Sequence, residues 1–254
     1  MIILLFDAGN SRCKWAWIEN GIWLRQGVHD NTDFASWLEL KNTFTLLVAP
    51  QKILVSNVAG AAMEQRLREL CTVWTCPLEF MESQAGQCGV RNGYDQPLQL
   101  GSDRWAALIA AWHRVHGACL VVNCGTATTV DALSATGAFV GGLILPGMEL
   151  MQRSLLSNTA QLGRVSSHPE SVVAHDFPRN TSDAILSGAM RATAGAIQHQ
   201  YALLAAQGRA ECIVSGGAAD SLLPYLGLEA VQVNDLILQG MQIIAQDCSS
   251  ISSG

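Results

Sequence analysis

Residues 1–14 read MIILLFDAGNSRCK, and residues 117–130 read GACLVVNCGTATTV. In each stretch an apolar run ends in a polar residue, Asp7 or Asn123, and a turn containing Gly9 or Gly125 follows two residues later. Continuous apolar runs bounded by turn residues are typical of buried strands. The two stretches align residue by residue without a gap, which predicts two similar domains related by duplication. The alternative is a coincidence between two ordinary strand–turn–strand units.

The residues that follow each run strengthen this interpretation. Residues 13–19 alternate, with Trp15 and Trp17 on the inward side, and Asn20-Gly21 predicts a tight hairpin to a third strand at 22–28. The later half repeats the pattern, with strands expected over 118–122, 128–133 and 138–145. Each half therefore predicts a three-stranded meander.

Helical and strand patterns alternate through the rest of the chain, which predicts an α/β fold. Asn31 and Thr32 are expected to cap a helix that includes Phe34, Trp37 and Leu38. Residues 84–101 are predicted to form a loop. Strands are expected over 53–58 and 211–215, and helices over 61–70, 105–115, 147–156, 181–206 and 218–225, with a last helix from about 234. We expect domains over 1–116 and 117–254.

The composition excludes several classes of protein. The 254 residues are 49% hydrophobic and 14% charged, which excludes general disorder, and the net charge of -6 argues against nucleic-acid binding. The eight cysteines form no CxxC pair, and the apolar run at the start is too short for a signal peptide or a membrane span. We expect a reduced, soluble, cytoplasmic protein without a membrane partner.

The first turn carries residues suited to binding phosphate. Gly9 allows close approach of the backbone, turn N–H groups can bind phosphate oxygens, and Lys14 adds a positive charge. Asp7, at the end of the strand, is a candidate ligand for Mg²⁺. The alternative is a surface hairpin with an Asx turn.

Two further stretches carry candidate chemistry. Gly125 and Thr126 begin a second turn rich in hydroxyl groups, and two such turns facing each other would grip a triphosphate from both sides. In Gly101-Ser102-Asp103-Arg104, an acid beside an arginine at a helix start suggests a base for a substrate hydroxyl and a clamp for negative charge. The alternative is that Ser102 or Asp103 only caps the helix.

These motifs together resemble type III pantothenate kinase. The resemblance rests on DxGNSxxK at 7–14, GxDR at 101–104, GTAxTxD at 125–131 and GGxIxPG at 141–147, and extends to Asn180-Thr181 and Gly216-Gly217. The motifs occur in order along nearly the whole chain. The resemblance implies two duplicated ribonuclease-H-like domains of the actin, sugar-kinase and Hsp70 superfamily, with ATP bound in the cleft between them. It also implies phosphorylation of pantothenate, the first step of coenzyme A synthesis, by a homodimer.

The resemblance also implies roles for individual residues. Asp103 would accept the proton, and Mg²⁺ would lie near Asp7. Residues of the first phosphate motif would bind ATP, as would the second turn and the adenosine loop: Asp7, Ala8, Gly9, Asn10, Ser11, Arg12, Cys13, Lys14, Gly125, Thr126, Gly216 and Gly217. Pantothenate would contact Tyr94, Gly101, Ser102, Asp103 and Arg104. It would also contact Thr181, which matches a threonine that family members contribute to the site across the dimer interface.

Two positions depart from the family pattern. Ser11 stands where threonine is common and keeps the hydroxyl group. Asn123 stands where many members have an aspartate that binds a monovalent cation, K⁺ or NH₄⁺. Because an amide brings no charge, we expect weak or absent dependence on potassium.

Two other functions stay open at this point. One is a kinase of the same superfamily that acts on another small hydroxyl compound, and the other is a non-catalytic accessory homologue. Asp7, Lys14 and Asp103 favour catalysis.

Overall fold

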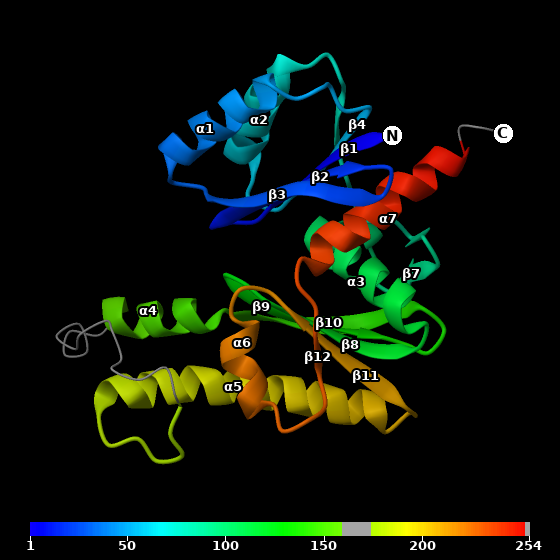
Figure 1. Ribbon diagram of the computed structural model, residues 1–254. Coiled ribbons are helices and arrows are strands. Elements are labelled where there is room, and N and C mark those ends of the chain that lie inside the picture. The colour runs from blue at the N-terminus through cyan, green and yellow to red at the C-terminus, as the bar shows by residue number, and fades with distance from the viewer. Residues whose placement is uncertain (159–173, 252–254) are drawn as a thin grey trace. The chain divides into compact units, whose positions relative to one another are not determined.

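The computed structural model describes residues 1–158 and 174–251 (Figure 1). Contacts divide the chain into two units, Met1–Arg114 with Asp235–Gly254 and Val115–Asn234. The boundary near residue 115 lies close to the one expected, but the final segment groups with the first unit rather than the second. The reason is that α7 (Leu236–Ile251) packs on strands of the first unit.

The first unit is built on a five-stranded sheet of order β3-β2-β1-β4-β5. The first three strands form the antiparallel meander that the alternating sequence predicts, and β4 and β5 add in parallel. Asn20 and Gly21 both have positive φ, 49° and 84°, as the tight hairpin requires. The strands are β1 (Ile2–Ala8), β2 (Arg12–Glu19), β3 (Ile22–Asp30), β4 (Lys52–Asn57) and β5 (Leu78–Phe80).

One face of this sheet holds an aromatic core beneath α1 (Phe34–Thr45) and α2 (Ala61–Leu70). Trp15 and Trp17 are buried there, as predicted, and pack around Phe44. The expected caps of α1, Asn31 and Thr32, lie two residues and one residue before the observed cap. Asp33 caps the helix by accepting a hydrogen bond from the Ser36 N–H, while Asn31 bonds elsewhere.

α3 (Ser102–Val115) begins three residues before the predicted start, because its first turn is polar and its apolar pattern begins only at Trp105. The predicted loop over 84–101 contains a small hairpin, β6 (Gly86–Gln87) and β7 (Val90–Asn92), and a short 3-10 helix, Pro97–Gln99. Another 3-10 helix, Cys71–Val73, follows α2.

The second unit repeats the strand order of the first. The run β10-β9-β8-β11-β12 is again an antiparallel meander extended by two parallel strands, which confirms the duplication predicted from the sequence. The strands are β8 (Ala118–Cys124), β9 (Ala127–Leu133), β10 (Ala138–Pro146), β11 (Ala210–Ser215) and β12 (Val231–Gln232).

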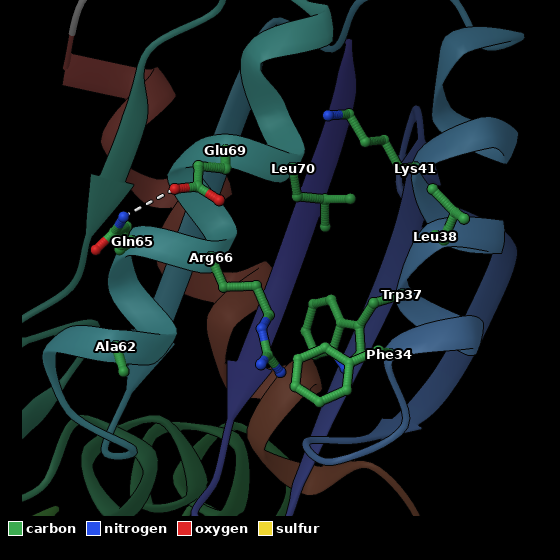
Figure 2. Close-up of a pocket in the computed structure, with 9 residues that line it drawn as sticks. All are labelled: Phe34, Trp37, Leu38, Lys41, Ala62, Gln65, Arg66, Glu69 and Leu70. Atoms are coloured by element: carbon green, nitrogen blue, oxygen red, sulfur yellow. Dashed lines mark hydrogen bonds between the residues drawn. The ribbon is translucent and has the colours of Figure 1, made fainter.

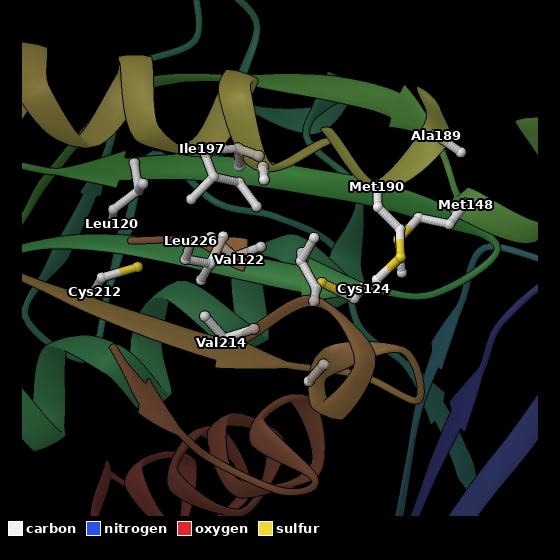
Figure 3. Close-up of a cluster of buried hydrophobic side chains, with 14 of the residues drawn as sticks. Leu120, Val122, Cys124, Met148, Ala189, Met190, Ile197, Cys212, Val214 and Leu226 are labelled. Atoms are coloured by element: carbon white, nitrogen blue, oxygen red, sulfur yellow. The ribbon is translucent and has the colours of Figure 1, made fainter. Parts of the chain in front are cut away.

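The helices of the second unit are α4 (Met148–Asn158), α5 (Thr181–Ala205) and α6 (Ala219–Leu222), with a 3-10 helix at Leu223–Tyr225. α5 packs on β8, β9 and β11 and encloses an apolar core that includes Leu120, Val122 and Ile197 (Figure 3). Within the described residues, no helix combines the length and apolar character needed to cross a membrane.

Candidate active site

The first predicted phosphate turn joins β1 to β2 and is stabilised by hydrogen bonds from the Asn31 side chain. The Gly9 N–H donates to the Arg12 carbonyl at 3.0 Å, which closes the turn. The Asn31 side-chain amide donates to the carbonyls of Gly9 and Asn10 at 2.8 and 2.9 Å. Asn10 and Ser11 are exposed. The turn therefore has a fixed shape and presents its tip to solvent.

Ala8 and Cys13 differ from the other residues of this motif. Both side chains are buried in the aromatic core, Ala8 at 0% and Cys13 at 1% exposure. Burial raises the pKa of the Cys13 thiol far above its ordinary value. Their side chains therefore stabilise the fold, and only their backbone is suited to binding a ligand.

Asp7 and Lys14 lie side by side on the face of the sheet opposite the aromatic core. They are direct partners in the β1–β2 register, which places their side chains on the same face. Asp7 is 9% exposed, and burial raises its pKa to about 7. The charges of Asp103 and Asp235 contribute to this rise in pKa, whereas the charge of Lys14 opposes it. Asp7 is thus a buried carboxylate with other carboxylates close by.

Asp235 contacts a candidate site residue, and the sequence did not predict this contact. Its carboxylate accepts a hydrogen bond from Lys14 Nζ at 2.8 Å, although more than two hundred residues separate the two in the chain. Asn31 was considered only as a helix cap. Neither residue carries a local pattern that indicates its tertiary contact.

Asp103 lies in the first turn of α3. Its Oδ1 accepts a hydrogen bond from the Arg104 N–H at 2.8 Å. Burial raises the pKa of Asp103, and this hydrogen bond and the Arg104 charge oppose the effect. Gly101 makes room for the carboxylate, since a Cβ at that position would lie 2.5 Å from Oδ1. Asp103 is therefore more basic than an exposed aspartate.

Arg104 and Tyr94 form one unit beside Asp103. Arg104 is 5% exposed, donates to the Tyr94 hydroxyl at 3.0 Å, and places Cζ 5.6 Å from the centre of the ring. Ser102 is also buried, and its hydroxyl bonds that of Ser56 at 2.9 Å. The Ser102 side chain is therefore engaged inside the fold.

The second predicted turn, in the second unit, is packed tightly against two other glycines. The Gly147 N–H donates to the Thr126 carbonyl at 2.9 Å, and a Cβ on Gly147 would lie 2.3 Å from the Gly125 carbonyl oxygen. Gly216 has φ +99°, and a Cβ there would lie 2.4 Å from the carbonyl oxygen of the residue before Gly125. Gly217 continues the same loop into α6. Backbone packing therefore fixes this turn, while Gly125 and Thr126 themselves are exposed.

Asn123 lies at the end of β8, between two strands. Its register partners are Thr129 on β9 and Ser215 on β11, and it is partly buried. An amide oxygen at this position can ligate a cation but adds no negative charge. Across residues 1–158 and 174–251, no group of three histidine, cysteine or acidic side chains is arranged to hold a metal.

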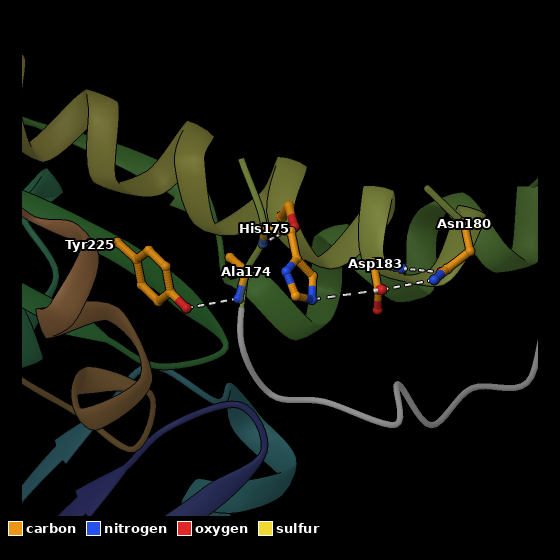
Figure 4. Close-up of polar contacts among 6 residues, drawn as sticks. Ala174, His175, Asn180, Asp183 and Tyr225 are labelled. Carbon is orange, nitrogen blue, oxygen red and sulfur yellow. Dashed lines mark hydrogen bonds and ion pairs between the residues drawn. The ribbon is translucent and has the colours of Figure 1, made fainter. Parts of the chain in front are cut away.

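Thr181 is the first residue of α5 and is exposed. Asn180 caps the helix, its side chain accepting from the Asp183 N–H at 2.9 Å (Figure 4). In the same view Asp183 lies 3.9 Å from His175 Nε2, and the Ala174 N–H donates to the Tyr225 hydroxyl at 2.7 Å. The start of α5 therefore carries several polar contacts.

A hollow of about 440 Å³ lies between α1 and α2, and none of the predicted site residues lines it (Figure 2). Arg66 extends across it, with Cζ 5.1 and 5.2 Å from the rings of Phe34 and Trp37. The same guanidinium donates to the Asn31 carbonyl at 2.6 Å. Arg66 thus contacts Asn31, the residue that bonds the first predicted phosphate turn.

The predicted residues fall into two sets, one in each unit. The first unit brings together Asp7, Lys14 and Asp103, with Arg104 and Tyr94 beside the last. The second unit brings together the turn at Gly125 and Thr126, the Gly216-Gly217 loop and Asn123, whereas Thr181 lies at the start of α5.

Known proteins resemble this chain over most of its length. The family model described as type III pantothenate kinase matches residues 3–203. A type III pantothenate kinase of Nitrosospira multiformis is 44% identical, covering 100% of this chain and 94% of the relative. One from Aromatoleum aromaticum is 42% identical, covering 97% and 98%.

Solved structures show the fold. A Listeria monocytogenes protein provisionally described as an N-acetylmannosamine kinase is 14% identical, with a TM-score of 0.57 and coverage of 100% of both chains. Component A of the Acidaminococcus fermentans (R)-2-hydroxyglutaryl-CoA dehydratase is 12% identical, with a TM-score of 0.53 and the same coverage. The duplicated ribonuclease-H-like architecture predicted from the sequence is confirmed. With its motifs in order, its duplicated sheets and relatives above 40% identity over nearly their full length, the chain belongs to the type III pantothenate kinase family.

Proposed function

We propose that this chain transfers the γ-phosphoryl group of ATP to the primary hydroxyl of pantothenate, which yields 4'-phosphopantothenate for coenzyme A synthesis. Membership of the family supports the reaction. The observation that carries the residue assignment is Asp103, a partly buried carboxylate of raised pKa at the start of α3 that interacts electrostatically with Asp7. An acid so placed serves as a base better than an exposed aspartate does.

In the proposed reaction the pantothenate hydroxyl oxygen attacks the γ-phosphorus. The bond between this phosphorus and the β–γ bridging oxygen breaks, and ADP leaves. Asp103 accepts the hydroxyl proton, for which its raised pKa is suited. The hydrogen bond from the Arg104 N–H fixes the orientation of the carboxylate. Phosphoryl transfer depends mainly on such positioning and on charge neutralisation.

Lys14 and the backbone of the first turn would offset the phosphate charge. The donor set suits Mg²⁺, because Asp7 is a buried carboxylate near a second one, and Mg²⁺ commonly binds one or two carboxylates together with substrate phosphates. When bound, Mg²⁺ would neutralise charge on the phosphate oxygens. We assign Asp7 as the residue that holds it, directly or through water.

We further assign Gly125 and Thr126 to a second phosphate contact, and Gly216 and Gly217 to the adenosine loop. The support is the fixed shape of the turn and the close packing that requires glycine at 216. Tyr94 and Arg104 would bind pantothenate as one hydrogen-bonded unit.

Asn123 leads us to propose weak or absent dependence on K⁺ or NH₄⁺. A neutral amide lowers affinity for a monovalent cation relative to a carboxylate. Turnover measured with and without potassium tests this, and a strong requirement at low millimolar concentration would contradict it. Restoring the charge with Asn123→Asp should increase the response to potassium.

We propose a homodimer that places Thr181 at the partner's pantothenate site. α5 carries small, exposed residues on one side, Ala184, Gly188, Ala192 and Gly195, and a Cβ built on either glycine would meet nothing within 4 Å beyond the adjacent residues and backbone of the helix itself. Such a surface allows another helix to approach closely. Mass measurement in solution tests the dimer, and Gly188→Glu should convert it to a monomer.

We also propose that the reaction takes place in the cytoplasm. The seven cysteines whose side chains the structure describes form no disulfide bonds, as in a reducing compartment.

The direct test of the function supplies purified protein with ATP and a panel of small hydroxyl compounds, with products identified by mass spectrometry. We expect phosphate on pantothenate, and preference for another acceptor would support the alternative kinase. In a strain lacking pantothenate kinase, the wild type should restore growth and Asp103→Ala should not. Equal rescue by both would contradict Asp103 as the base, and rescue by neither would favour the accessory role.

A further inference from the structure

We infer that Asp235 is a positioning residue that holds Lys14 ready for the phosphates of ATP. This inference rests on the proposed function. Lys14 Nζ lies 2.8 Å from Asp235 Oδ1, and the two side chains are 35% and 26% exposed. The pair is thus screened from solvent over most of its surface, where an ion pair is stronger than at a fully exposed site.

The β1–β2 register determines where Lys14 points. Leu4, Phe6 and Ala8 pack in the aromatic core, so the alternation of β1 places Asp7 on the opposite face. Lys14, the direct partner of Asp7, shares that face. α7 packs on β1 and β4 and carries Asp235 at its start. The lysine therefore extends between the candidate phosphate turn and the beginning of α7.

The backbone fixes the position of Asp235. Its carbonyl accepts the Gln239 N–H at 3.0 Å, which makes it the residue from which α7 begins. Gly240, one turn further on, packs against α3 so closely that a Cβ would lie 1.8 Å from the Ala106 carbonyl oxygen. α3 also carries Asp103. The contact between α3 and α7 therefore fixes the position of Asp235 relative to Asp103.

The conformation of Asp235 indicates which substitution isolates its charge. Its φ of 52° lies in the left-handed region, which asparagine and aspartate adopt more readily than other residues with side chains. Asp235→Asn therefore keeps the backbone and the size of the side chain and removes the charge. Asp235→Ala would also strain the start of α7.

Pairing limits the conformations of a long, flexible lysine side chain before ATP arrives. Without Asp235, that ordering would have to occur on binding, at the expense of affinity. Protein kinases use a comparable pairing of a phosphate-binding lysine with a glutamate. Loss of one partly exposed ion pair and its ordering effect predicts about tenfold weaker binding of ATP.

The test measures binding of a non-hydrolysable ATP analogue with Mg²⁺ by calorimetry. The proteins are the wild type, Asp235→Asn, Lys14→Met and the double variant. We expect about tenfold weaker binding for Asp235→Asn and no further loss when it is added to Lys14→Met. The control Asp247→Asn removes a carboxylate from the other end of α7 and should bind as the wild type does. Unchanged or tighter binding by Asp235→Asn would overturn the inference, as would an equal loss in the Lys14→Met background.

Kinetics separate positioning from a general structural defect. Asp235→Asn should raise KM for ATP and leave kcat and KM for pantothenate near the wild-type values, whereas a defect in the fold would lower kcat as well. If the wild type binds the analogue but does not phosphorylate pantothenate, the proposed function fails while the binding measurements still decide the role of Asp235. If the wild type does not bind the analogue, both fail.

Discussion

Replacing Asp7 with asparagine should stabilise the protein in the absence of ATP and Mg²⁺, and the gain should grow as pH rises. Burial raises the pKa of Asp7 from 3.8 to about 7, with Asp103 adding to the effect. Such a carboxyl binds more protons in the folded chain than in the unfolded one. Stability is therefore lost as pH rises between these two values. An asparagine of the same size has no such dependence.

The pKa values set the magnitude. The rise in the pKa of Asp7 from 3.8 to about 7 corresponds to a loss of about 4 kcal/mol in the free energy of unfolding between acidic pH and pH above 7. Between pH 5 and pH 8 the advantage of Asp7→Asn over the wild type should grow by about 2 to 3 kcal/mol. The variant should lose activity, because the same carboxylate is the proposed Mg²⁺ ligand.

Urea unfolding in EDTA, followed by tryptophan fluorescence, measures this effect. All seven tryptophans lie in the first unit, which also contains Asp7, so the signal reports the unit of interest. Asp95→Asn, at an exposed position, provides the control and should show no advantage that depends on pH. An Asp7→Asn advantage of equal size at both pH values would refute the reasoning.

Three other substitutions or treatments test the packing around the site. Gly240→Ala should destabilise by about 1–3 kcal/mol in thermal or urea unfolding, because its Cβ would collide with the Ala106 carbonyl, and stability equal to that of the wild type would contradict this. Gly101→Ala should lower kcat with little loss of stability, because its Cβ displaces only the end of the Asp103 side chain; a normal kcat would contradict this. Alkylation of the native protein at neutral pH, measured by peptide mass spectrometry, should modify the partly exposed Cys88. It should spare the four thiols whose pKa is raised to about 12 by burial: Cys71, Cys119, Cys124 and Cys212. Early modification of any of these four would contradict the prediction.

Local patterns were sufficient to predict the two meanders. The alternation that buries Trp15 and Trp17 and the Asn20-Gly21 turn act over neighbouring residues, so the sequence displays them directly. Helix α2 over Ala61–Leu70 was predicted with its observed bounds for the same reason. The short strands β5 and β12 were missed because two or three residues carry too little pattern to distinguish a strand from a loop.

Local sequence patterns did not predict the tertiary contacts around the candidate site. Asn31 has the local character of a helix cap, yet its amide bonds the turn at Gly9, and Asp33 takes the capping role. Asp235 reaches Lys14 only because α7 returns to pack on β1. Ser102, the first residue of α3, bonds the hydroxyl of Ser56 on β4. Each of these contacts depends on the tertiary fold, which no motif spacing encodes.

The central claim is that Asp103 accepts the proton of the pantothenate hydroxyl. The most direct measurement is kcat for Asp103→Asn with saturating ATP and pantothenate, together with binding of both substrates. We predict that kcat falls by about 10²–10⁴ while both substrates still bind. Turnover close to that of the wild type would contradict the account.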